Sequence, residues 1–295
     1  MEALKVRIIT DNGIDIDPKR ITGLPIHIVP LVINFDEKVY RGGVDIQSDE
    51  FYRMLKNNPD KFPTTSQPSP GDFQTVYTEQ ASFDTEIISI HISAQLSGTY
   101  NSARLAGEMV KDQGINVTVI DSKLVSGGEA WLVEAAGRAA QAGASRDEII
   151  SLVDKLAQHI RLIFSPETLK YLVHGGRVSH LKGFAASLLN IKPIIQLKYE
   201  TGKLDQLGTV RTMKKALAQQ VEQIHQEIGD QRARIQIIHA DNPQGATEVH
   251  DLLSQRLDCH FMPITNVTPI VGAHTGPGVV GMVYAKESLF DGLPS

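Results

Sequence analysis

Residues 85–110 have the sequence TEIISIHISAQLSGTYNSARLAGEMV. The segment Glu86–Ile92 is short and rich in isoleucine, which is typical of a strand covered on both faces in a parallel sheet. After a short loop, Leu105, Met109 and several alanines recur at helical spacing, so we expect a helix that begins near Thr99. A strand, a loop and a helix in this order predict one unit of a parallel α/β sheet.

The loop inside this stretch is the tetrad Leu96-Ser97-Gly98-Thr99. A loop in this position aims free backbone N–H groups and the positive end of the helix dipole at whatever lies above the sheet, which suits an anion. Ser97 or Thr99 could equally serve only as the cap of the helix. The loop alone leaves both interpretations open.

The first half of the chain continues the alternation of strands and helices, with strands expected at Val6–Thr10 and Asn116–Ser122. From about residue 160 the pattern changes, because Lys192–Val210 contains two extended segments around a turn, which indicates an antiparallel hairpin. We therefore predict an α/β fold with two domains. Residues 1–159 form a parallel-sheet α/β/α domain, and residues 160–295 form an α+β domain with a mixed or antiparallel sheet.

Composition narrows the functional classes. Of the 295 residues, 41% are hydrophobic and 21% charged, values typical of a soluble globular protein. The formal charge of −5 argues against a nucleic-acid-binding surface. The single cysteine, Cys259, excludes an internal disulfide and a cysteine-based zinc site, and we expect it to be a buried small side chain rather than a nucleophile. With no membrane-length apolar run and no signal-peptide core at the N-terminus, we expect a cytoplasmic protein.

Two acidic residues, Asp11 and Asp15, follow the first expected strand, at the edge where open α/β sheets place their sites. Two carboxylates there are compatible with a metal. The turn pair Asn12-Gly13 and the helix start at Asp17-Pro18 explain the same segment without one. We therefore predict no metal site.

A cluster of hydroxyl groups lies at Thr64, Thr65 and Ser66, followed by Gln67. These side chains can offer several donors to one oxygen-rich ligand, although solvated loop residues are an equal alternative. Near the C-terminus, His274 is expected at a strand end, in a loop among glycines that let backbone and ligand approach closely. Arg177 follows a Gly-Gly pair, so its guanidinium could turn inward toward a carboxylate or phosphate, although an exposed arginine is the default.

The glycine-rich segment 276–281, GPGVVG, matches the dinucleotide pattern G-x-G-x-x-G letter for letter. That pattern must follow the first strand and open a helix, whereas residues 282–285 have the character of a strand. We therefore do not expect a dinucleotide site here.

Taken together, the chain resembles the DegV family of bacterial fatty-acid-binding proteins, the B subunits of fatty acid kinase. The motifs that carry the resemblance recur in order over almost the whole chain. They are Thr64-Thr65-Ser66-Gln67-Pro68-Ser69, Leu96-Ser97-Gly98-Thr99-Tyr100-Asn101-Ser102-Ala103, Asp121-Ser122, His174-Gly175-Gly176-Arg177-Val178-Ser179, Leu189-Asn190-Ile191-Lys192-Pro193-Ile194 and Gly272-Ala273-His274-Thr275-Gly276-Pro277-Gly278.

The resemblance implies a non-catalytic subunit that holds one long-chain fatty acid in an apolar tunnel, with no other cofactor. A separate ATP-using kinase subunit would phosphorylate the carboxylate, and the acyl phosphate would go to phospholipid synthesis. An acyltransferase and transient contact with a membrane surface are further implied partners. Carried over motif by motif, the carboxylate would be bound by Thr65 and Ser97, with Ser66, Arg177 and His274 completing the polar shell and Asn101 and the Gly98 backbone as further candidates.

Two other functions compete with the carrier. A serine hydrolase would use Ser97 as nucleophile, His274 as base and Asp11, Asp15 or Asp121 as orienter, but Gln95 stands where G-x-S-x-G requires glycine. A kinase in its own right lacks a P-loop and a metal-binding carboxylate set. Positive charge is concentrated in the second half, and we interpret it first as a solvated face and second as a surface for an acidic partner or anionic lipid headgroups: Lys198, Lys203, Arg211, Lys214 and Lys215.

Overall fold

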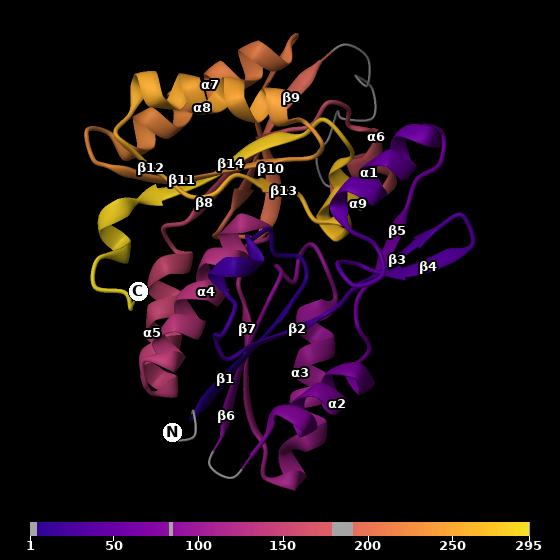
Figure 1. The fold of residues 1–295 in the computed structure, drawn as a ribbon, viewed down its shortest axis with the longest axis vertical. Coiled ribbons are helices and arrows are strands. Elements are labelled where there is room, and N and C mark those ends of the chain that lie inside the picture. Colours follow the sequence, from indigo (N-terminus) through magenta and orange to yellow (C-terminus); the bar gives the residue numbers. More distant parts are fainter. Residues whose placement is uncertain (1–4, 83–84, 179–190, 295) are drawn as a thin grey trace.

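A four-stranded parallel sheet forms the lower half of the molecule in Figure 1, in the order β2-β1-β6-β7. The computed structural model describes residues 5–82, 85–178 and 191–294. The strands of this sheet are β1 (Val6–Asp11), β2 (Ile26–Val29), β6 (Glu86–His91) and β7 (Asn116–Asp121). All three pairings are parallel, as predicted for the strand–loop–helix unit.

Helices cover both faces of this sheet because side chains alternate along each strand. Ile9 and Ile87 share a core with α2 (Pro70–Gln80) and α3 (Thr99–Val110). Ile8, Ile88 and Ile90 face the other way and share a core with α4 (Gly127–Gln141) and α5 (Arg146–Ala157). The helix predicted near Thr99 begins at that residue. Its alanines are buried, whereas Leu105 and Met109 are exposed.

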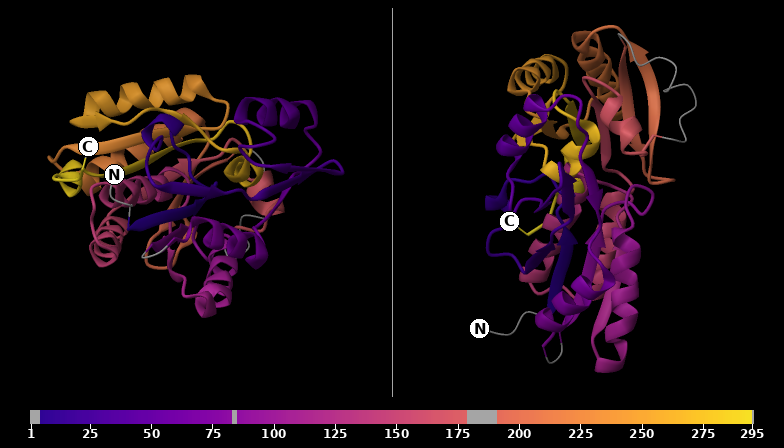
Figure 2. Two further views of the ribbon diagram at one scale, coloured as in Figure 1. Left: turned by 60° about the horizontal axis from the view of Figure 1, so that its bottom comes forward. Right: turned by 90° about the vertical axis from the view of Figure 1, so that its right-hand side faces the viewer.

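A larger mixed sheet forms the upper half, in the order β10-β9-β8-β14-β11-β12, with β13 also pairing with β11. Its strands are β8 (Arg161–Ser165), β9 (Lys192–Lys198), β10 (Lys203–Val210), β11 (Ala233–His239), β12 (Cys259–Phe261), β13 (Thr265–Asn266) and β14 (Val280–Lys286). The predicted hairpin is β9–β10, an antiparallel pair. Two helices, α7 (Met213–Ile228) and α8 (Pro243–Arg256), cover the outer face (Figure 2).

The inner face of the mixed sheet packs toward the first half. Leu162, Phe164 and Ile238 belong to the same buried cluster as the residues of α4. A methyl group on Gly127 of α4 would lie 2.7 Å from the Gln236 side chain of β11, so glycine lets this helix approach the sheet closely. The chain passes from the parallel sheet to the mixed sheet near residue 160. We therefore propose residues 1–159 and 160–295 as the two domains.

A small antiparallel sheet has the strand order β4-β3-β5. Its residues belong to the first half of the chain, but it lies beside helices of the second half (Figure 1). It consists of β3 (Val32–Phe35), β4 (Lys38–Arg41) and β5 (Thr64–Ser66), and α1 (Ser48–Asn57) follows β4. Its neighbour is α9 (Pro269–Thr275), which in turn packs against α6 (Lys170–His174). The Tyr52 hydroxyl of α1 donates to the Val267 carbonyl at 3.0 Å, which links α1 to the second half of the chain.

Local capping explains where the helices begin. Ser69 and Ser145 each form a capping box, with Asp72 and Glu148 respectively. Helix α8 begins at Pro243, because the Asn242 side chain caps the Gly245 N–H. Short 3₁₀ helices span Pro18–Arg20, Lys111–Gln113 and Glu287–Phe290. Within the described ranges, no helix is both long and apolar enough to cross a membrane.

Candidate functional site

A largely apolar cavity lies where the two halves and the small sheet meet. It contains about 720 Å³ of space free of protein atoms, part of which is open to solvent. Its apolar wall draws on both halves of the chain and comprises Leu31, Ile92, Leu96, Val125, Leu162, Phe164, Leu172, Leu204, Ile238, Val267, Ile270, Val271 and Val279. Six polar residues complete the lining: Thr65, Ser97, Ser126, Arg177, His274 and Thr275.

Four of the predicted site residues therefore reach one cavity from four separate segments. Thr65 comes from β5 and Ser97 from the loop between β6 and α3. Arg177 follows α6, and His274 lies in the last turn of α9. The first two belong to the first half of the chain and the other two to the second half.

His274 lies in a helix, so the expectation of a strand-end loop is wrong. Thr268 and Pro269 begin α9, and the left-handed backbone of Gly276, φ +75°, ends it. Gly272 is the residue of α9 that lies directly against the Tyr52 ring, where a methyl group would collide with the hydroxyl. The glycines that suggested a loop therefore pack this short helix against its neighbours.

The His274 imidazole is neutral and hydrogen-bonds Thr65. Its Nε2 lies 2.7 Å from Thr65 Oγ1, and its buried Nδ1 has no partner among the described residues. Burial lowers the pKa of His274 to about 3, assisted by the nearby Arg177 and His174. A neutral imidazole carries one hydrogen, so Nε2 donates to the Thr65 hydroxyl in one tautomer and accepts from it in the other. In the tautomer with Nε2–H, the Thr65 hydroxyl hydrogen is available to a ligand in the cavity.

Arg177 turns inward and binds backbone carbonyls. Its Nε donates to the Leu96 carbonyl at 3.1 Å and its Nη1 to the Gly175 carbonyl at 2.5 Å. Burial lowers the pKa of Arg177, although a guanidinium stays charged at neutral pH. Arg177 thus links the end of α6 to the loop that carries Ser97. It also places a positive charge at the polar end of the cavity.

The Ser97 loop is held by hydrogen bonds within itself and from the second half. The Thr99 N–H donates to Ser97 Oγ at 3.3 Å, and the two hydroxyls lie 2.8 Å apart. Ser93 Oγ donates to the Gly202 carbonyl at 2.7 Å, in the turn between β9 and β10. Gly98 is needed for space, because a methyl group there would lie 2.5 Å from Gln67 Nε2. The two hydroxyl-bearing segments are therefore directly packed.

The remaining predicted residues lie outside the cavity wall. Ser66 and Asn101 are exposed, where Ser66 accepts a long hydrogen bond from Asn34 and Asn101 accepts one from Arg104. Gly98 lines a surface depression that adjoins the polar end, together with Ser97, Arg177 and Lys203. From the motifs quoted above, Ser179, Leu189 and Asn190 lie outside the described residues.

Sequence reasoning missed Ser126 and Thr275 as cavity residues. Ser126 precedes α4 with φ 63° and ψ −140°, a conformation that is rare for a residue with a side chain. Its Oγ donates to Asp15 Oδ2 at 2.5 Å. The Gly127-Gly128 pair that follows signals an unusual backbone here, but nothing local indicates that it borders a cavity.

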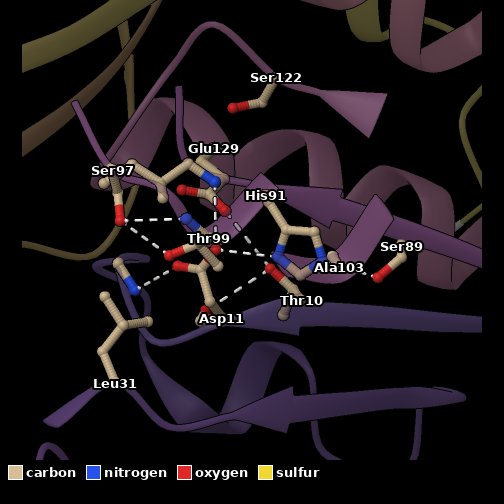
Figure 3. A network of polar contacts seen from close by, with 12 residues as sticks. Thr10, Asp11, Leu31, Ser89, His91, Ser97, Thr99, Ala103, Ser122 and Glu129 are labelled. Atoms are coloured by element: carbon tan, nitrogen blue, oxygen red, sulfur yellow. Dashed lines mark hydrogen bonds and ion pairs between the residues drawn. The ribbon is translucent and has the colours of Figure 1, made fainter. Parts of the chain in front are cut away.

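A buried polar network supports the sheet edge beneath the cavity (Figure 3). Figure 3 shows His91 between Asp11 and Ser89, with Nδ1–Oδ2 and Nε2–Oγ distances of 2.9 and 2.6 Å. Glu129 accepts a long hydrogen bond from Thr10, and its other oxygen has no described partner. Burial and the nearby carboxylates, Asp11 first, raise the pKa of Glu129 well above its usual value. The environment of Glu129 therefore favours the protonated, neutral form of its carboxyl group.

The geometry does not form a hydrolase triad. His274 bonds Thr65, and no carboxylate in the described part of the chain hydrogen-bonds its Nδ1. The proposed orienters bond elsewhere: Asp11 bonds His91, Asp15 bonds Ser126, and Asp121 accepts from the Ala94 and Lys123 N–H groups. An imidazole with a pKa of about 3 is also a weak general base.

Metal and thiol chemistry find no support either. No group of three or more potential metal ligands was found among the described residues. Asp11 and Asp15 are the pair that first suggested a metal, but their carboxylates already have hydrogen-bond partners. Asp11 bonds Gly13, His91 and Ile92, and Asp15 bonds Ser126 and Thr268. Burial raises the pKa of Cys259 to about 11, so its thiol is not an activated nucleophile.

Comparison with known proteins decides the family. The model of the DegV family, described as a family of uncharacterised proteins, matches residues 5–287. The chain belongs to the DegV family. A DegV domain-containing protein of Staphylococcus aureus is 34% identical over 281 residues, which cover 95% of this chain and 98% of that protein. A relative from Caldanaerobacter subterraneus is 35% identical over 284 residues, covering 96% and 99%.

Solved DegV structures share the fold, which confirms the predicted fold class. A DegV family protein from Thermus thermophilus, described by its fatty acid binding, is 29% identical with a TM-score of 0.85, covering 95% of this chain and 99% of that chain. DegV of Bacillus subtilis, described as a fatty acid binding protein, is 27% identical with a TM-score of 0.85, covering 97% and 100%. A stearic acid-binding protein from Eubacterium ventriosum is 28% identical with a TM-score of 0.82, covering 96% and 98%.

Proposed function

We propose that this DegV protein holds one long-chain fatty acid in the cavity, with the carboxylate at the end lined by Thr65, Ser97, Arg177 and His274. A separate ATP-dependent kinase subunit then phosphorylates the exposed carboxylate to an acyl phosphate. The observation that supports the proposal is the cavity itself. Its wall is mostly apolar, and hydroxyl, guanidinium and imidazole groups complete its lining. The fatty acid binding described for the solved relatives from Thermus and Bacillus, and the stearic acid binding described for the one from Eubacterium, agree with it.

The acyl chain supplies most of the affinity. Burying about sixteen carbons at ~0.8 kcal/mol per methylene is worth on the order of 12 kcal/mol before entropic and ordering costs. Each hydrogen bond to a charged carboxylate adds only about 1.5–3 kcal/mol. The apolar wall therefore retains the ligand, and the polar residues decide which end of it faces outward.

The polar end suits an ionised carboxylate. The Thr65 hydroxyl can donate to a carboxylate when Nε2 of His274 carries the imidazole hydrogen, and Arg177 adds a positive charge nearby. A carboxylate in an apolar cavity without such donors would be too costly to bury. A bound carboxylate would also favour the protonated imidazole and so raise the low pKa of His274.

The surface depression beside Ser97 supports presentation to a kinase. Gln95, Gly176 and Lys203 in its wall are exposed, whereas Ser97 and Arg177 belong both to the depression and to the cavity. An acid held at this junction can be reached by a partner while its chain stays covered. An acyltransferase and a membrane surface would receive the product, and the cytoplasm is the compartment that supplies ATP.

Mass spectrometry of an organic extract of the purified protein tests the carrier function. We expect one fatty acid per chain, or stoichiometric uptake of added oleate or palmitate. Absence of both results would contradict the proposal. Incubation with ATP and a fatty acid kinase catalytic subunit tests the second step, for which we expect acyl phosphate only when both proteins are present. Labelling of Ser97 by a fluorophosphonate would instead support the hydrolase.

A further inference from the structure

One buried carboxyl group contacts both the cavity wall and the helix that carries His274. Asp15 Oδ2 accepts from Ser126 Oγ at 2.5 Å, and its Oδ1 accepts from the Thr268 N–H at 2.7 Å. Asp15 is completely buried, and its carboxyl bonds no arginine, lysine or histidine in the described part of the chain. Ser126 belongs to the first half of the chain and Thr268 to the second, so this carboxylate joins the two across the cavity.

Thr268 is the residue that begins α9, and His274 lies in the last turn of this seven-residue helix. A helix of this length is one short rigid rod, so a displacement of its first residue moves its last. The backbone of Asp15 is held as well, because Gln236 Nε2 of β11 donates to its carbonyl at 2.8 Å. The position of Asp15 is thus set by β11, while Asp15 sets the start of α9.

We propose that Asp15 is a positioning residue of the fatty-acid site, whose ionised carboxylate holds α9, and with it His274, against the cavity wall at Ser126. This proposal rests on the proposed fatty-acid function. Hydrogen bonds to a charged acceptor are about twice as strong as those between neutral groups. Protonation of Asp15 therefore weakens the bond from Thr268. It also lets Asp15 donate to Ser126, which reverses that hydrogen bond in the cavity wall.

Mild acidification is enough to protonate the Asp15 carboxylate. Burial raises the pKa of Asp15 to about 6, against the opposing effect of the bonds from Ser126 and Thr268. The other titratable groups that act on this cluster are Glu129 of α4 and Tyr52 of α1. Burial raises the pKa of both, which favours their neutral forms, and neither is a positive charge that would compensate the Asp15 carboxylate.

The test compares the pH dependence of oleate binding by the full-length protein and by Asp15→Asn, which mimics the protonated state. We expect Asp15→Asn to bind oleate about three- to tenfold more weakly than the parent at pH 7.5, with the gap closing by pH 5. The ratio of the two affinities removes the titration of oleate itself. Asp17→Asn is the matched control, because that carboxylate caps its own 3₁₀ helix. The ratio of its oleate affinity to that of the parent should stay near one at every pH.

Ser126→Ala provides an independent measurement if Asp15→Asn does not fold. Removing the Ser126 hydroxyl removes a bond that lowers the pKa of Asp15, so the midpoint of the pH dependence should move upward. The positioning role is overturned if the midpoint of the pH dependence does not move in Ser126→Ala. It is also overturned if the affinity of Asp15→Asn relative to the parent is the same from pH 5 to 7.5. If the parent protein binds no oleate at any pH, the fatty-acid function fails and the positioning role fails with it.

Discussion

His274 Nε2 lies 2.7 Å from Thr65 Oγ1, although 209 residues separate the two in the chain. The pair joins α9 of the second half to β5 of the small sheet, at the polar end of the apolar cavity. In the tautomer of His274 that carries its hydrogen on Nε2, the Thr65 hydroxyl can donate toward the cavity. A carboxylate ligand at this end of the cavity would favour that tautomer, because a carboxylate only accepts hydrogen bonds.

Removing the two hydroxyls should impair chemistry more than binding. In Thr65→Ala/Ser97→Ala, the acyl chain still fills the cavity, but the carboxylate loses the donors that orient it. We expect fatty-acid affinity to fall by about tenfold and acyl phosphate formation with the kinase subunit by more than about a hundredfold. Calorimetry and a coupled kinase assay measure the two effects. Loss of all binding with unchanged turnover per bound lipid would contradict the proposed roles.

A methyl group at Gly175 should displace His274. An added Cβ at this position collides with His274 Nδ1 and lies 3.1 Å from the Tyr171 carbonyl. We expect Gly175→Ala to weaken oleate binding by about tenfold, ~1.4 kcal/mol, because the Thr65–His274 pair cannot keep its geometry. Gly71→Ala is the control, since its nearest atom is Ser69 Oγ at an ordinary 3.6 Å. Equal affinities for the two variants would show that the imidazole is not constrained by Gly175.

Neutralising Arg177 should raise the pKa of His274. Burial is the main reason that this pKa is about 3, and the positive charge of Arg177 is the next. We therefore expect Arg177→Gln to shift the imidazole titration upward, measured by nitrogen NMR of labelled histidine. Arg104→Gln, an exposed change on α3, should leave the titration where it is. A downward shift would mean that Arg177 does not act on His274 through its charge.

Glu129→Gln should change the pH dependence of stability in a definite direction. The carboxyl is neutral when folded and its pKa is raised, so its contribution to stability is complete below pH 4.5 and is lost as the pH rises toward the folded value. Glutamine does not titrate. The free energy of unfolding of the variant minus that of the parent should therefore increase from pH 5 to pH 8 in urea titrations. Glu108→Gln, exposed on α3, should show no such trend, and a flat difference for Glu129→Gln would refute the neutral assignment.

Local features of the chain were predictable from residue patterns. The isoleucine-rich run at Glu86–His91, the helix that begins at Thr99 and the hairpin β9–β10 all follow from periodicity and turn residues. Helix starts at Ser69 and Ser145 follow from side-chain caps. These features depend on hydrogen bonds between residues a few positions apart, so a short window of sequence contains the information.

The position of His274 illustrates where such patterns fail. A histidine among glycines was expected in a loop, but those glycines let α9 pack closely against Tyr52 and Tyr171. Ser66 and Asn101 share motifs with Thr65 and Ser97, yet their side chains are exposed, because successive residues of a strand or helix point in different directions. Which member of a motif faces the cavity depends on packing against distant segments.

The sequence by itself determined the parallel strand–helix unit, the hairpin β9–β10 and the family to which the chain belongs, because these depend on short-range hydrogen bonding and on motifs that can be compared directly. Only the tertiary structure decided that His274 lies in a helix and contacts Thr65, that Ser126 belongs to the cavity wall, and that burial favours the neutral forms of Glu129 and His274. The physical reason is that contact and desolvation are properties of an environment assembled from distant parts of the chain.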